Sequence, residues 1–141
     1  MKHLLGTLLL TALAIPVLAQ SVSESSNSIA SSNPSTATFH FPDGAYMTAT
    51  CNAAGGSDTV TVGMPGDAEP TVSHPVLSCS FGPGYYGTNI TTSVAPFEVT
   101  DSGRLVSVES ATWSVHRTCR AGRGGGCSPW QLVGGAASID Y

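Results

Sequence analysis

Four cysteines are the residues of this chain whose type and spacing most directly predict chemistry: Cys51, Cys79, Cys119 and Cys127. Four cysteines allow three disulfide connectivities. Seven residues separate Cys119 from Cys127, and four of them are glycine, so the chain can fold back and bridge this pair locally. That pairing leaves Cys51 with Cys79. We therefore expect two intrachain disulfides, each worth about 3 kcal/mol on the chain-entropy model.

Other chemistry finds little support in the residue pattern. A metal site needs cysteines and histidines at ligand spacing, and His116-x-x-Cys119 is an isolated near-match. The sequence has no Gly-x-Ser-x-Gly and no His-Glu-x-x-His motif, and the glycine-rich residues 122–126 lack the Lys-Ser/Thr of a phosphate loop. Asp67 and Glu69 are expected in a solvated loop. We therefore predict no catalytic residue, no metal and no cofactor.

Arginine is the residue type through which this chain would bind an anionic partner. Residues 20–103 carry seven acids and neither Lys nor Arg, whereas residues 104–141 carry four arginines and two acids. Guanidinium groups bind carboxylates and sulfates in a bidentate manner. The alternative is that these arginines are solvated turn residues that balance an acidic body. The candidate partner-binding arginines are Arg104, Arg117, Arg120 and Arg123.

Two surface features add to this picture. Asn89-Ile90-Thr91 is an N-glycosylation acceptor, which predicts a glycoprotein with Asn89 at the surface. Tyr85 and Tyr86 are flanked by glycines, and we treat them as a candidate loop for contacting a partner or a glycan, the alternative being a half-buried rim. The acidic balance, with no lysine after Lys2, disfavours nucleic acid as a partner.

The N-terminal composition predicts a secreted, extracellular protein. Residues 1–19 have a short basic start, an apolar run and small residues before a cleavage site, which is typical of a signal peptide; an uncleaved membrane anchor is the alternative. After cleavage no membrane association is expected. Residues 20–35 are serine-rich and are predicted to be a flexible, O-glycosylated leader, with a cleaved propeptide as the alternative. Residues 36–141 then form a single disulfide-bonded β domain.

From Thr36 onward apolar residues recur with period two, the period of strands. Turn signals at residues 42–44 and 101–103 separate strand candidates. This pattern predicts an all-β fold, a small antiparallel β-barrel or β-sandwich with two disulfides. The predicted strands cover residues 36–41, 46–51, 58–64, 76–81, 89–94, 97–100, 104–109, 112–119 and 131–141, the last with a bend at Gly134-Gly135.

Several short segments carry a family resemblance. They are residues 48–54, residues 74–79, the Cys-Arg-Ala-Gly of residues 119–122, and Gly134-Gly135-Ala136 before a final strand. Over roughly residues 39–141 the chain resembles the small secreted fungal β-barrel proteins typified by the major Alternaria allergen. The resemblance implies two intrachain disulfides and the binding of host proteins or small ligands. The type member also dimerises through an extra N-terminal cysteine, which is absent between residues 20 and 50 here, so no disulfide-linked dimer is expected.

Together these observations predict a secreted, non-enzymatic binding protein, effector-like or allergen-like, that acts through surface contacts. Its partner would be a host protein, a glycan or a small ligand. The alternative is a structural cell-wall or surface-associated glycoprotein whose serine-rich leader carries sugars.

Overall fold

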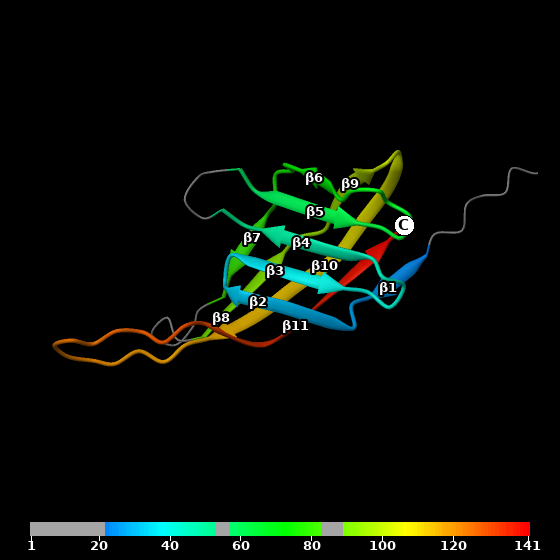
Figure 1. The fold of residues 1–141 in the computed structure, drawn as a ribbon. Coiled ribbons are helices and arrows are strands. Elements are labelled where there is room, and N and C mark those ends of the chain that lie inside the picture. Colours follow the sequence, from blue (N-terminus) through cyan, green and yellow to red (C-terminus); the bar gives the residue numbers. More distant parts are fainter. Residues whose placement is uncertain (1–21, 53–56, 83–88) are drawn as a thin grey trace, which may run out of the picture.

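Two antiparallel β-sheets packed face to face make up the protein (Figure 1). The computed structural model describes residues 22–52, 57–82 and 89–141. Across these ranges the chain is built from strands and turns, and it contains no helix that could cross a membrane. The all-β prediction is confirmed. The sheets are not hydrogen-bonded edge to edge into a closed barrel within the described ranges, so the sandwich is the architecture observed.

The five-stranded sheet runs in chain order, because each strand turns directly into its neighbour. Alternation explains its two faces: in β3 the side chains of Ala37 and Phe39 are buried, whereas Thr36 and Thr38 belong to the outer face. Cross-strand threonine pairs line the outer face, with the hydroxyl oxygens of Thr38 and Thr48 2.7 Å apart. The strands are β2 (Ser28–Asn33), β3 (Thr36–His40), β4 (Tyr46–Thr50), β5 (Thr59–Gly63) and β6 (Thr71–Ser73).

The six-stranded sheet is organised around its longest strand, β10. On one edge β10 pairs with β11, which pairs in turn with β1. On the other edge β9 pairs with the first part of β10 and β8 with the last part, and β7 pairs with β8. The strands are β1 (Ser23–Ser25), β7 (Cys79–Phe81), β8 (Asn89–Val94), β9 (Phe97–Asp101), β10 (Arg104–His116) and β11 (Gln131–Asp140).

β10 corrects the sequence interpretation, which expected two strands over residues 104–109 and 112–119. A single strand, Arg104–His116, covers the first and residues 112–116 of the second, with a break in its register against β11 between Val108 and Ser110. Both Glu109 and Ser110 face outward, so the alternation changes phase there and the apolar side chains on either side reach the same core. The buried side chains of β10 are Val106, Val108, Ala111, Trp113 and Val115.

The serine-rich segment is a second correction. Residues 23–25 and 28–33, expected in a flexible leader, form β1 and β2. The Val22 amide donates to the Tyr141 carbonyl at 2.6 Å, and the Tyr141 amide donates back at 3.0 Å. The prediction of a flexible segment from composition was wrong because an edge strand can be held by backbone hydrogen bonds and one packed apolar side chain, here Ile29. The predicted signal peptide lies outside the described residues. The sequence interpretation also missed β6.

The two predicted turns are confirmed. Ser102 and Gly103 have φ angles of 48° and 81°, the left-handed values of a type I′ turn, and they join β9 to β10. Between β3 and β4, Gly44 has a φ of 93°, and the Asp43 carboxylate accepts the Ala45 amide at 2.9 Å. Asp-Gly and Ser-Gly pairs favour such turns because glycine adopts positive φ without steric cost.

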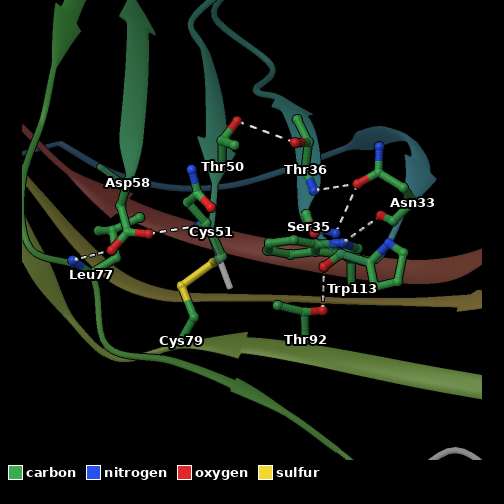
Figure 2. The surroundings of a disulfide bond; sticks show 12 residues. Asn33, Ser35, Thr36, Thr50, Cys51, Asp58, Leu77, Cys79, Thr92 and Trp113 are labelled. Carbon is green, nitrogen blue, oxygen red and sulfur yellow. Dashed lines mark hydrogen bonds between the residues drawn. A yellow bond between two sulfur atoms is a disulfide. The ribbon is translucent and has the colours of Figure 1, made fainter. Parts of the chain in front are cut away.

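Trp113 of β10 ties the two sheets together. Its side chain is fully buried, and its ring meets Phe39 edge-on at a centroid distance of 6.0 Å. Its indole Nε1–H donates to the Asn33 carbonyl at 3.3 Å, and the nearby Thr92 hydroxyl donates to the Pro34 carbonyl at 2.6 Å (Figure 2). The turn between β2 and β3 is therefore hydrogen-bonded to β10 and β8 of the opposite sheet.

The contact between Ile29 and β11 can be tested with two neighbouring glycines. A Cβ on Gly135 would lie 2.7 Å from Ile29 Cδ1 and 2.5 Å from the Thr112 carbonyl oxygen, whereas nothing lies within 4 Å of one on Gly134. We expect Gly135→Ala to lower the free energy of unfolding by about 1–3 kcal/mol. Gly134→Ala, the matched control, should change it by less than about 0.5 kcal/mol. Denaturant titrations measure both; equal effects would contradict the packing of β2 on β11.

Candidate binding arm

Residues 117–130 form a hairpin, hereafter the arm, that projects past the end of the sandwich (Figure 1). β10 and β11 stop pairing at His116 and Gln131, and the two chain segments continue together beyond the sheet. Cys119 and Cys127 face each other across an isolated antiparallel bridge and are joined by a disulfide, as predicted. Residues 120–129 are all exposed. The arm is therefore held by covalent and backbone bonds and not by a core.

Backbone geometry explains the glycines at the tip of the arm. The Arg120 amide donates to the Gly126 carbonyl at 2.9 Å, which narrows the hairpin. Gly122 and Gly124 have positive φ angles of 108° and 75°. A Cβ on Gly125 would lie 2.3 Å from the Arg120 carbonyl oxygen. The glycines therefore allow a tight turn. Arginine is the charged residue type at its tip.

Three of the four candidate arginines belong to the arm. Arg117 lies over the Trp130 ring, with its Cζ 4.2 Å from the ring centroid, a cation–π contact at the base of the arm. Arg120 and Arg123 are exposed further out. Because the sequence has no acid between Glu109 and Asp140, the arm carries a charge of +3 on an acidic protein.

Arg104 lies away from the other three. It begins β10, whose last residue, His116, precedes the arm. At 3.3 Å per residue the strand spans roughly 40 Å, so Arg104 is at the opposite end of the sandwich. There its Cζ is 5.5 Å from the centre of the Tyr141 ring. The grouping of all four arginines is therefore corrected to a set of three.

The glycosylation candidate lies beside the root of the arm. Asn89 is the first residue of β8, is exposed, and pairs across the strands with His116. The Asn89 Oδ1 and His116 Nδ1 atoms are 2.9 Å apart. A glycan on Asn89 would therefore stand next to the start of the arm. The other loop candidates, Tyr85 and Tyr86, lie outside the described residues.

The weak metal motif is ruled out by the covalent structure. Cys119 is disulfide-bonded and so cannot serve as a thiolate ligand beside His116. No group of three His, Cys, Asp or Glu side chains in the described ranges is arranged to hold a metal ion.

The second disulfide has a different setting from that of the arm. Cys51, at the end of β4, is 1% exposed and is bonded to Cys79 of β7, so this bridge joins the two sheets. The Asp58 carboxylate supports the bridge on both sides by accepting the Asn52 amide at 2.8 Å and the Leu77 amide at 3.1 Å (Figure 2). The predicted connectivity is confirmed.

A buried carboxyl cluster at the far end of β10 was missed by sequence reasoning. Asp101, the last residue of β9, is 2% exposed and accepts a hydrogen bond from the Thr71 hydroxyl of β6. The Asp67 carboxyl neighbours it, since both residues line one surface pocket and Asp67 raises the pKa of Asp101. Asp67 had been assigned to solvent, and nothing in a separation of 34 residues links it to Asp101. The packing of the two sheets creates the pair.

Burial raises the pKa of Asp101, and the neighbouring Asp67 carboxyl raises it further, against the opposing effects of Thr71 and Arg104. The pair borders a surface pocket of about 240 Å³ lined by residues 64–67, 101, 102 and 104. The Asp101 side chain is 2% exposed and lies at the border of this pocket.

Comparison with known proteins adds no assignment: no family model, no curated protein and no solved structure matches this chain. The resemblance to the allergen family therefore stays a prediction.

Removing each disulfide separately should distinguish their roles. We expect Cys51→Ala with Cys79→Ala to lower the free energy of unfolding by about 3–4 kcal/mol, because the bridge closes a long loop between the sheets. Cys119→Ala with Cys127→Ala should cost less than about 1 kcal/mol, well below the chain-entropy value of about 3 kcal/mol, because without the bond the exposed arm gains conformational freedom in the folded state as well. Thermal and denaturant unfolding measure both pairs. Equal losses would mean that the arm contributes to the cooperative fold.

Proposed function

We propose that this protein is a secreted, non-enzymatic binding protein that engages an anionic host protein or glycan through its arm. One observation carries the proposal: the same segment projects from the sandwich, is closed by a disulfide and is positively charged. The arm is exposed over residues 120–129, is closed by a disulfide, and carries three of the four arginines.

The disulfide favours binding because it lowers the conformational entropy that the arm loses when it binds a partner. A hairpin closed by the bond between Cys119 and Cys127 is already ordered before contact. Arg120 and Arg123 then offer planar donor groups to carboxylates or sulfates. The alternative role, charge balance for an acidic body, fits less well because the arm extends away from the acid-bearing sheets (Figure 1).

The size of the surface pockets favours a macromolecular partner over a small ligand. Two of the pockets that border the described residues have volumes of about 240 and 140 Å³. Sites that enclose drug-sized ligands usually exceed about 300 Å³. A projecting arm instead suits contact with the surface of a protein or glycan.

Secretion is supported by the predicted signal peptide at residues 1–19 and by two disulfides with no free cysteine in the described ranges. A glycan on Asn89, as the sequence predicts, would flank the arm at its root and leave the tip available. The resemblance to effector-like and allergen-like fungal proteins agrees with a binding role of this kind.

Charge reversal at the tip tests the proposal. We expect the double variant Arg120→Glu and Arg123→Glu to bind a sulfated heparin oligosaccharide or an acidic peptide at least tenfold more weakly, because each charged hydrogen bond contributes about 1.5 kcal/mol or more. Arg104→Glu makes the same type of charge reversal at the opposite end of β10 and should change the affinity less than twofold.

Calorimetry at low and at physiological salt measures these affinities, and binding through the arm should weaken as salt rises. If the tip variant and Arg104→Glu lost affinity equally, the loss would come from the change in net charge and not from the position of the arginines. If the tip variant bound as tightly as the wild type, the arm would not be the binding site.

A further inference from the structure

The sandwich is closed differently along its two sides. On one side the chain itself crosses from β1 in one sheet to β2 in the other, and Ile29 packs on β11 at Gly135. On the other side β6 is the edge of one sheet, and β7 and β9 lie at the edge of the other (Figure 1). Within the described ranges no strand pairing joins these edges, so side-chain bonds must fasten them.

Two side-chain bonds reach from β7 and β9 to the other sheet. The disulfide between Cys51 and Cys79 joins β7 to the end of β4, the middle strand of that sheet. Thr71 of β6 donates its hydroxyl hydrogen to the Asp101 carboxyl of β9, with Asp67 beside it at the border of the same pocket. These contacts link the sheets on this side near the β9–β10 hairpin.

Each carboxyl group of the pair is positioned by a tight turn. The Asp67 amide donates to the Met64 carbonyl at 3.1 Å, and the Met64 amide donates back to Asp67 Oδ2 at 2.9 Å. Gly66, with a φ of 90°, allows this turn. Asp101 directly precedes the type I′ turn that joins β9 to β10 and lies opposite Arg104 in the ladder. The Asp67 side chain is thus held by its own turn, and the Asp101 side chain by its hydrogen bond with Thr71.

Two neighbouring carboxylates repel each other, which favours a proton on one of them. The charged group that faces the pair from β10 is Arg104, which favours ionisation of Asp101. From β6 the facing group is the neutral Thr71, and from the turn before β6 it is Asp67 itself. Glu69, in the same loop, is exposed.

We propose that Asp67, Thr71 and Asp101 form a proton-dependent latch that fastens the β6 and β9 edges of the sandwich in acid and loosens them as the pH rises. The buried position of Asp101, 2% exposed, makes this proton part of the packing between the sheets. Loss of that proton leaves two neighbouring negative charges, with Arg104 at the rim as partial compensation.

The direction of the pH effect follows from the pKa of Asp101, which burial and Asp67 raise above its ordinary value of 3.8. A carboxyl group with a raised pKa in the folded state binds its proton more tightly there than in the unfolded chain. Its stabilising contribution is complete below pH 3.8 and is lost as the pH rises through the raised value.

Unfolding temperatures from acid to neutral pH test the latch in the full secreted chain. Asp101→Asn keeps the shape of the side chain, can accept from Thr71 and donate to Asp67, and removes the titration. We expect the unfolding temperature of the wild type, relative to that of this variant, to fall by on the order of 4 °C between acid and neutral pH. Glu69→Gln, an exposed carboxyl in the same loop, should follow the wild type.

Two further measurements keep the test decisive if Asp101→Asn folds poorly. Asp67→Asn can still accept the Met64 amide and should reduce the pH dependence, leaving the part that comes from the burial of Asp101. In the wild type, amide protection of β9 and the start of β10, corrected for intrinsic exchange rates, should fall as the pH rises, while that of β3 and β4 stays constant. A wild-type pH slope in both Asn variants, or β9 protection independent of pH, would overturn the latch.

Discussion

The contact between Trp113 and the turn from β2 to β3 is the interaction on which the sandwich depends. A fully buried indole needs a partner for its N–H, and the Asn33 carbonyl of the opposite sheet supplies it. The same turn accepts the Thr92 hydroxyl at Pro34, so two polar bonds set the alignment of the sheets at their centre. Phe39 then packs edge-on against the indole. Serine-rich β2 is part of the fold because it leads into this turn.

This central alignment leaves the ends of β10 free for different uses. At one end the strand continues into the arm, which holds its shape through a disulfide and backbone bonds and keeps its arginines in solvent. At the other end the hairpin from β9 to β10 is linked to β6 through the buried Asp101 carboxyl, which accepts the Thr71 hydroxyl. The arm and the Asp101 carboxyl therefore lie at opposite ends of one strand.

Most of the strands could be predicted because alternation is a local property. β3, β4, β5 and β8 were expected almost at their observed bounds, since each alternates a buried apolar face with an outer threonine or serine face. β10 was split in two because its bulge changes the phase of the pattern, which in a sequence looks like the end of a strand. β1 and β2 were missed because composition measures apolar area, while edge strands rest largely on backbone bonds.

By itself the sequence determined the all-β class and the charge of the arm, and it favoured the local Cys119–Cys127 bond, because each follows from residue types and separations within short segments. Only the tertiary structure decided that Cys51 meets Cys79 between the sheets, that Arg104 lies far from the arm and that Asp67 lies beside the buried Asp101. The reason is physical: these relations depend on which sheet edges face each other across the core. No local spacing records that arrangement, because it is produced by the packing of two sheets around Trp113.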